Sequence, residues 1–315
     1  MKKSRLVVLL GPTAVGKTAL SLALARKLGA EIISGDSMLF YRGFDIGTAK
    51  PTLEEREVVP HHLIDILEPS ASFSVTDFQR LAAKKIACIE ARGRLPFIVG
   101  GTGLYIKSLL EGYAFNKTAG NAAYRERIET MAQEKGKDFV HGLLQKVDPE
   151  AAGRLHVNDF RRVVRALEVA ALGQERISKS REAEAGGLVY DAYVVGLRRD
   201  RQKLYERIEE RVDIMLRDGL EEEVRHLLSG GVSAACQAMK GIGYKETVAY
   251  LAGCMDRSEA EEEIKKATRH FAKRQMTWFR KMPYIHWYDA ENISEEMLCT
   301  KIYTDIRRFF MIRCK

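Results

Sequence analysis

The sequence lacks paired cysteines and long apolar runs. Its five cysteines are odd in number, widely spaced and form no C-x-x-C pair, which argues against a disulfide framework and against a zinc knuckle. No segment approaches the ~20 apolar residues of a membrane helix. The basic and apolar start of the chain mimics a signal peptide, but its apolar run is too short. We therefore expect a cytoplasmic protein with no membrane segment.

Acidic residues are fewer than basic ones, and the formal net charge of the 315-residue chain is +8. A basic chain favours an acidic partner, and nucleic acid is the commonest one. The charge alone fits a basic enzyme that binds no polymer equally well. The chain is long enough to bury a full core and to divide into two units.

Short apolar runs alternate with helical patterns in the first hundred residues. Residues 6–10 are fully apolar and end at Gly11, as in a buried strand of a parallel sheet. A helical pattern over 17–28 stops at Gly29, and further strands are expected at 31–34 and 95–99, with a helix over 77–92 between them. This alternation, with residues 11–18 fitting a phosphate-loop motif between the first strand and the first helix, predicts the fold class: α/β, a P-loop NTPase-like doubly wound parallel sheet.

The strand signal disappears between residues 115 and 187, where charged helical patterns take over. We interpret 115–187 as a helical insertion subdomain, and 1–114 with 188–315 as the core. In the second part of the core we expect strands at 189–197 and 284–287, a long helix at 203–228, a basic helix at 258–281 and a final helix at 295–311.

A phosphate-binding motif lies between the first strand and the first helix. It fits G-x-x-x-x-G-K-[ST] and consists of Gly11, Pro12, Thr13, Ala14, Val15, Gly16, Lys17 and Thr18. Its glycines let backbone N–H groups face phosphate oxygens, and the helix N-terminus adds positive field. Lys17 supplies a charge, and the Thr18 hydroxyl is a ligand for Mg²⁺, the one cofactor that we expect.

The magnesium-binding Asp of nucleotide-hydrolysing P-loop proteins is missing. Such an Asp usually ends a hydrophobic strand, but residues 97–99 lead into Gly100-Gly101-Thr102-Gly103. This difference indicates a loop that holds a diphosphate whose cleavage needs neither a positioned water nor phosphoryl transfer.

Several segments in this order resemble the tRNA dimethylallyltransferase family over nearly the whole chain. They are the phosphate loop, Asp36-Ser37-Met38 through Tyr41-Arg42-Gly43, Asp45-Ile46-Gly47-Thr48-Ala49-Lys50-Pro51, Pro60-His61-His62-Leu63-Ile64-Asp65, Gly100 to Tyr105, Arg165 to Val169, and Thr268 to Trp278. The resemblance implies transfer of a dimethylallyl group from dimethylallyl diphosphate to the N6 amino group of the adenosine immediately 3′ of the anticodon. The C-terminal zinc finger of eukaryotic relatives is absent, so a bacterial-type enzyme is implied. Residues 156–162 lack two prolines expected in the family.

Three residues are candidates for catalysis. Asp36 follows the second strand at the ligand-binding edge of the sheet, where a carboxylate can act as general base, although a helix cap or a surface acid fits the same pattern. Thr102 is placed to bond the adenine or Asp36, or else to stabilise its turn. The resemblance implies that Arg211 grips the diphosphate, whereas the pattern alone describes Arg207 and Arg211 as a solvated, Glu-paired helix face.

The tRNA anticodon arm is the expected polymer partner, bound by a monomer together with dimethylallyl diphosphate. Residues 264–281 contain seven Lys/Arg and no acid, which favours RNA over a merely solvated face. The expected tRNA-binding residues are Asp36, Ser37, Met38, Leu39, Thr102, Arg161, Arg162, Arg165, Lys240, Lys245, Arg269, Lys273, Arg274 and Gln275. Three of these arginines lie in 115–187, so we expect the helical insertion to contact tRNA, with 1–114 and 188–315 as the catalytic core. We interpret His61 and His62 as structural or substrate-adjacent rather than metal-ligating.

Three other functions remain open from the sequence. A small-molecule P-loop kinase shares the loop and the fold. A prenyltransferase acting on free AMP or ADP shares the catalytic core, but it needs neither the insertion nor the basic helix. A non-catalytic RNA-binding protein with the loop as a switch would bind RNA without forming a product.

Overall fold

The computed structural model describes residues 3–115, 118, 120–173 and 187–312. Its contacts divide the chain into two compact units, Met1–Leu110 with Leu188–Lys315 and, inserted between these segments, Glu111–Gly187. Cys314 and parts of the expected insertion (116–117, 119 and 174–186) lie outside the described residues. Among the helices that are described, none has the length and apolar character needed to cross a bilayer.

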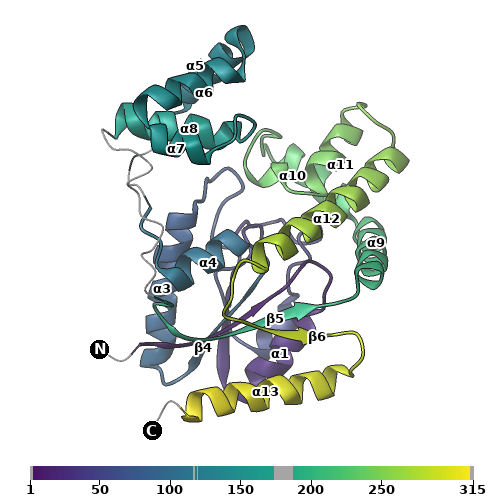
Figure 1. Ribbon diagram of the computed structural model, residues 1–315. Helices are drawn as coiled ribbons and strands as arrows, with labels where there is room; N and C mark the ends of the chain where they lie inside the picture. Colours follow the sequence, from purple (N-terminus) through teal and green to yellow (C-terminus); the bar gives the residue numbers. More distant parts are fainter. Residues whose placement is uncertain (1–2, 116–117, 119, 174–186, 313–315) are drawn as a thin grey trace. The chain divides into compact units, whose positions relative to one another are not determined.

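The first unit contains a six-stranded sheet in the order β3-β2-β4-β1-β5-β6 (Figure 1). The strands are β1 (Arg5–Leu10), β2 (Ala30–Ser34), β3 (His61–His62), β4 (Leu95–Gly100), β5 (Asp191–Arg198) and β6 (Ile285–Asp289). Each pairing between neighbouring strands is parallel. The expected doubly wound parallel α/β fold is thus confirmed. The sheet brings the carboxyl ends of β1, β2 and β4 to one edge, where ligands bind in such folds.

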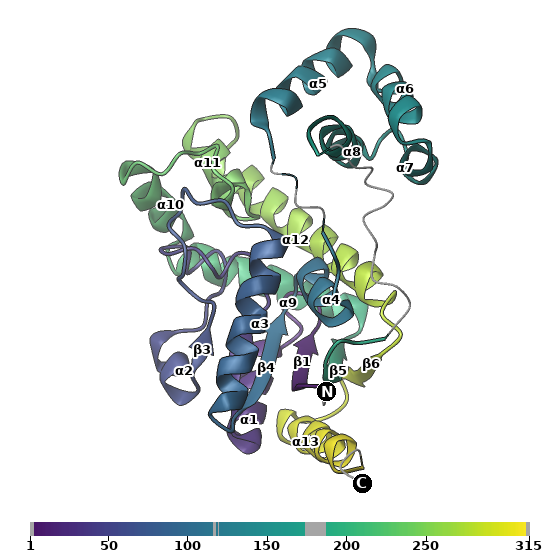
Figure 2. The ribbon, with the colours of Figure 1, turned by 90° about the vertical axis from the view of Figure 1, so that its left-hand side faces the viewer.

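Helices cover both faces of the sheet (Figures 1 and 2). In β1, Val7 and Leu9 belong to the core beneath α1 (Lys17–Leu28) and α13 (Glu295–Ile312). Leu6 and Val8 point the other way, into the core shared with α3 (Val75–Ala91) and α4 (Gly103–Glu111). Burial on both faces explains why β1 is apolar at every one of its central positions.

A third hydrophobic cluster lies beyond the sheet edge. It joins α9 (Arg201–Arg217), α10 (Leu220–Ser229), the short η2 (Ala238–Lys240), α11 (Tyr244–Leu251) and α12 (Arg257–Phe279). The buried rings of Tyr41, Phe44 and Tyr244 form its centre. The six-residue α2 (Leu53–Val58) follows the segment that carries Tyr41 and Phe44, and begins at a capping box on Thr52.

The prediction of one long helix over 203–228 is wrong. The structure ends α9 at Arg217 and begins α10 at Leu220. Gly219 between them has φ 104°, a left-handed conformation that interrupts a right-handed helix and that glycine adopts without steric cost. The apolar period continues across the break, which is why periodicity missed it.

The described part of the second unit contains four helices, α5 (Ala122–Lys135), α6 (Lys137–Val147), α7 (Pro149–Arg154) and α8 (Phe160–Leu172). Their apolar faces share one core that includes Ile128, Val140 and Leu144. The side chain of Asn121 caps α5, and that of Asp148 caps α7. These four helices therefore have a hydrophobic core of their own.

Candidate active site

The phosphate loop connects β1 to α1 with two residues in left-handed conformations. Ala14 has φ 63° and Gly16 has φ 107°, and no side chain caps the start of α1. The Lys17 ammonium folds back over the loop and donates to the carbonyls of Gly11 (3.0 Å) and Pro12 (2.8 Å). An uncapped helix N-terminus with a lysine over the loop is suited to an anionic ligand.

Three charged side chains influence one another beside this loop. Burial lowers the pKa of Lys17 to about 8, while the nearby Asp36 carboxylate opposes that shift and the nearby Arg211 guanidinium adds to it. These effects require the side chains to be close, although α9 follows β2 by more than a hundred residues. The structure thus brings Asp36 and Arg211 to the lysine of the phosphate loop.

Asp36 and Thr102 are neighbours because the ends of β2 and β4 touch. A Cβ on Gly100 would lie 2.3 Å from the backbone of Gly35, so only glycine allows this approach. Asp36 Oδ1 accepts from the Met38 N–H at 3.1 Å, which is the local bond of a turn-capping acid. Thr102 Oγ1 accepts from the Ser37 N–H at 3.0 Å and lies 3.3 Å from the Ser37 hydroxyl, so its hydroxyl contacts the residue next to Asp36.

Two arginines one helical turn apart on α9 have different surroundings. Arg207 Nε donates to the Ala14 carbonyl at 2.9 Å, and so supports the phosphate loop from outside. Arg211 lines the central cavity instead, where burial lowers its pKa and the charge of Arg207 lowers it further. The Glu-paired helix face considered from the sequence pattern describes neither arginine, because neither forms an ion pair with a carboxylate within the described residues.

The central cavity has a volume of about 390 Å³ and combines charged and apolar walls. Lys17, Thr18, Asp36 and Arg211 supply its charged and polar part. Its apolar lining includes Ile32, Leu39, Ile64, Val212 and Met215. Such a cavity can hold a ligand that has both an anionic group and an apolar tail.

The two adjacent histidines face different surroundings. His62 Nε2 bonds Glu31 Oε2 at 2.7 Å inside the fold, whereas His61 lines the cavity and its Nδ1 bonds the Val59 carbonyl at 2.7 Å. Burial lowers the pKa of His61. Within the residues that the structure describes, no three His, Cys, Asp or Glu side chains are grouped as metal ligands.

Two protein-family models match the chain. The family model described as IPP transferase matches residues 39–282, and the one described as isopentenyl transferase matches residues 4–65. The chain belongs to the IPP transferase family. It is 50% identical over 289 residues to a tRNA dimethylallyltransferase of Bacillus cytotoxicus, covering 92% of this chain and 91% of the relative, and 48% identical over 305 residues to that of Bacillus subtilis, covering 96% and 97%.

Solved structures of relatives share the fold over nearly the whole chain. The tRNA isopentenylpyrophosphate transferase of Bacillus halodurans gives a TM-score of 0.75 at 42% identity, covering 99% of this chain and 100% of that one. A eukaryotic dimethylallyltransferase acting on tRNA gives a TM-score of 0.79 at 30% identity, covering 92% of this chain and 74% of that one. The resemblance noted from the sequence motifs is therefore confirmed at the level of the family.

In this family member, the basic helix α12 carries two kinds of cation. Lys265 pairs with Asp213 and Glu261, Lys266 with Glu263, and Arg269 with Glu209. Lys273 and Arg274 are exposed, and neither forms an ion pair with another residue that the structure describes. Arg274 also lines the central cavity. The C-terminal half of α12 thus offers the cations that remain available for phosphates, whereas the Arg269 guanidinium already has a carboxylate partner.

Gln275 is buried, with 5% of its surface exposed, and both ends of its amide are used. Its Oε1 accepts from the Thr13 N–H and its Nε2 donates to the Gly101 carbonyl, each at 2.9 Å. We expected this side chain to face a tRNA base. The structure places it between the phosphate loop and the turn that carries Thr102.

The remaining expected tRNA-binding residues differ in their surroundings. Ser37, Met38, Leu39 and Lys240 line the central cavity, and Lys245 pairs with Glu246 at 3.2 Å. In the second unit, Arg161 is exposed and Arg162 lies 4.0 Å from Asp159. Arg165 is engaged inside its own unit, where it bonds the buried Glu168 and the Thr118 carbonyl.

One part of the cavity wall was missed as a functional element. Gly47, Thr48, Ala49 and Pro51 line the cavity. These residues belong to the segment Asp45 to Pro51, which carries part of the family resemblance but suggested no chemistry by residue type. Its glycine and the turn-forming Asp-x-Gly spacing were the available signal.

Proposed function

We propose that this protein transfers the dimethylallyl group of dimethylallyl diphosphate to the N6 amino group of the adenosine immediately 3′ of the anticodon in tRNA, in the cytoplasm. The observation that carries the proposal is the single cavity that combines the phosphate loop, Asp36, Arg211 and an apolar lining. Membership of the IPP transferase family supports it. Phosphoryl transfer is catalysed by positioning and charge stabilisation, whereas an allylic donor also has an apolar tail that the walls beside the phosphate loop can bind.

In the proposed reaction, the adenine nitrogen forms a bond to the allylic carbon as the bond from that carbon to the diphosphate oxygen breaks. The leaving diphosphate gains charge, which Lys17, Arg211 and the N–H groups of the loop stabilise. The proton of the amino group passes to the Asp36 carboxylate, which acts as general base. Thr102 and Ser37 position the adenine beside Asp36. The products are the prenylated amine, diphosphate and a protonated Asp36.

The Thr18 hydroxyl would hold Mg²⁺. Mg²⁺ prefers hard oxygen ligands and is usually bound by one or two protein groups together with phosphate oxygens and water. The donor set in this cavity fits that pattern, because Thr18 lines it beside Lys17. When bound, the ion would neutralise charge on the diphosphate.

We further propose that the anticodon arm binds along α12 and the second unit. The exposed Lys273 and Arg274 are suited to phosphate contacts, and Arg161 and Arg162 are exposed on α8. A stacked adenine hides its amino group, so the base must leave the stack to enter the cavity. Contacts on both flanks would offset the few kcal/mol that unstacking costs.

Mass measurement of unmodified tRNA after incubation with the protein, dimethylallyl diphosphate and Mg²⁺ tests the reaction. We expect a gain of one five-carbon unit on one adenosine. An anticodon stem-loop and free AMP are compared in parallel, and the stem-loop should be far the better substrate. Equal reaction of AMP would replace this proposal with a free-nucleotide prenyltransferase, and nucleotide turnover without prenylation would indicate a kinase.

A further inference from the structure

A tight turn over residues 45–50 forms part of the cavity wall. Ala49 has φ 49°, a left-handed conformation that is uncommon for a residue with a side chain. Two backbone bonds of 3.0 Å close the turn, from the Ala49 N–H to the Ile46 carbonyl and from the Lys50 N–H to the Asp45 carbonyl. A turn that holds a non-glycine residue in this conformation must be stabilised by its surroundings.

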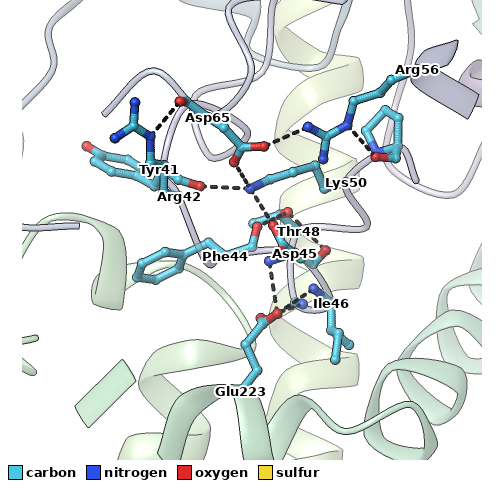
Figure 3. Close-up of polar contacts among 12 residues, drawn as sticks. Tyr41, Arg42, Phe44, Asp45, Ile46, Thr48, Lys50, Arg56, Asp65 and Glu223 are labelled. Atoms are coloured by element: carbon cyan, nitrogen blue, oxygen red, sulfur yellow. Dashed lines mark hydrogen bonds and ion pairs between the residues drawn. The ribbon is translucent and has the colours of Figure 1, made fainter. Parts of the chain in front are cut away.

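The Glu223 carboxylate, from α10, binds one side of this turn (Figure 3). Its Oε2 accepts from the N–H groups of Asp45 at 2.9 Å and Ile46 at 2.8 Å, and its Oε1 accepts from the Gly47 N–H at 3.2 Å. Successive backbone N–H groups that converge in this way form an anion-binding nest. Here the anion is a side chain of the protein itself.

Tyr244 completes the contact from α11. Its hydroxyl donates to Glu223 Oε1 at 2.6 Å, and burial together with the neighbouring carboxylate raises the pKa of this phenol. A Cβ on Gly47 would lie 2.6 Å from the Tyr244 ring, so the turn packs directly on the ring. Glu223 therefore holds three residues of the turn by hydrogen bonds, and Tyr244 packs on one of them, Gly47.

The buried Lys50 holds the opposite end of the turn (Figure 3). Its ammonium contacts Asp45 Oδ1 and Asp65 Oδ1, each at 2.5 Å, and donates to the Tyr41 carbonyl at 2.8 Å. Although burial opposes the shift, hydrogen bonds from Lys50 and Arg56 hold the pKa of Asp65 below its usual value. The turn is thus fixed at both ends by charged groups.

The turn separates two hollows. Ala49 and Pro51 line the central cavity of about 390 Å³ and also a second, outer cavity of about 720 Å³. Arg211 and Met215 also line both. Movement of the turn would therefore join the cavity that contains Lys17 and Asp36 to the space outside it.

We propose that Glu223 is a positioning residue that locks the turn as the wall of the prenyl site, and that this wall limits the length of the allylic chain. The proposal rests on the proposed function, because it assigns the cavity to an allylic diphosphate. Without the carboxylate, three N–H groups lose their acceptor and the wall loosens. The apolar tail then loses contacts, while the diphosphate keeps those made by the phosphate loop.

Calorimetric titration of the full chain with three ligands tests this. For Glu223→Ala we expect the affinity for dimethylallyl diphosphate to fall about tenfold, equivalent to about 1.4 kcal/mol. The affinity for inorganic diphosphate should stay within about twofold, and the preference for dimethylallyl over geranyl diphosphate should narrow by about tenfold. An equal loss for inorganic diphosphate, or unchanged affinity for all three, would overturn the proposal.

Three further variants complete the test. Glu222→Ala, an exposed neighbour on the same helix, should bind all three ligands like the wild type. Tyr244→Phe keeps the ring against Gly47 and removes one donor, so it should shift the ligand preference in the same direction by less. If Glu223→Ala fails to fold, Tyr244→Phe and Glu223→Gln decide the outcome by the same three titrations.

Amide hydrogen exchange tests the role of Glu223 independently of the proposed reaction. In Glu223→Ala and Tyr244→Phe the amides of Asp45, Ile46 and Gly47 should exchange faster than in the wild type, whether or not tRNA is modified. The titrations contain no tRNA. A wild-type protein that binds the three ligands but does not modify tRNA would therefore refute the proposed reaction and leave the role of Glu223 intact. Unchanged exchange at these amides would overturn the role of Glu223.

Discussion

The Gln275 amide accepts a hydrogen bond from the Thr13 N–H at 2.9 Å, across 262 positions of sequence. Its other end donates to the Gly101 carbonyl. One side chain of the basic helix thus connects the phosphate loop with the turn that precedes Thr102. The Thr13 N–H belongs to the loop that would hold the diphosphate, so the position of α12 and the geometry of the loop are linked.

Replacement of Gln275 by Leu should destabilise the protein and weaken diphosphate binding together. The half-buried Thr13 N–H and the buried Gly101 carbonyl would lose their partners, and an unsatisfied buried group costs about 1–3 kcal/mol. Denaturant unfolding and calorimetric titration with inorganic diphosphate measure the two effects. Thr277→Ala, an exposed neighbour on α12, should change neither. Selective loss of tRNA affinity with normal stability would instead mean that Gln275 contacts a base.

Diphosphate binding should depend on pH through Lys17. Burial lowers the pKa of this ammonium to about 8, so in the free protein it is charged below that pH and neutral above it. A bound diphosphate favours the charged form and raises the pKa again. Affinity should therefore fall as pH rises above about 8, and binding near pH 8.5 should take up protons.

Calorimetry in buffers of different ionisation enthalpy measures this uptake. Diphosphate has titrations of its own, so Lys17→Met serves as the reference and should show less uptake than the wild type. Identical uptake by the two proteins would contradict a proton on Lys17. Binding of tRNA should be nearly unchanged in Lys17→Met, because the ammonium faces the phosphate loop.

Asp36→Asn should keep both substrates bound and slow the chemical step. Loss of a general base typically costs ~10²-fold or more in rate. Asn retains an oxygen that can accept from the Met38 N–H, the local bond that Asp36 makes at 3.1 Å. Single-turnover rates with saturating tRNA and donor isolate the chemistry from binding. An unchanged rate would leave Asp36 as a turn-capping residue only.

Lys273→Ala and Arg274→Ala should weaken binding of all tRNA sequences and flatten the dependence of log K on log salt by ~1 unit for each lost phosphate contact. Lys266→Ala is the matched control on the same helix, since that ammonium pairs with Glu263 at 2.8 Å. Its salt slope should match the wild type. If the salt slopes of all three variants equal that of the wild type, α12 faces solvent in the complex.

The sequence was sufficient for the features that depend on neighbours along the chain. Apolar strands, helical periods and a glycine stop located β1, α1, β2 and β4, and parallel order followed because each strand is separated from the next by a helix. The spacing of the phosphate loop located the anion site for the same local reason. The break at Gly219 was the error, because the apolar period continues across it.

Only the tertiary structure decided which polar side chains meet. Glu223 binds a turn 177 positions away at Ile46, and Gln275 binds Thr13 across 262 positions. Arg165 and Arg269, two cations expected to face RNA, each have a carboxylate partner within the protein. Residue type indicates that a side chain needs a hydrogen-bonding partner. The packing of distant elements, driven mainly by apolar burial, decides which partner it finds.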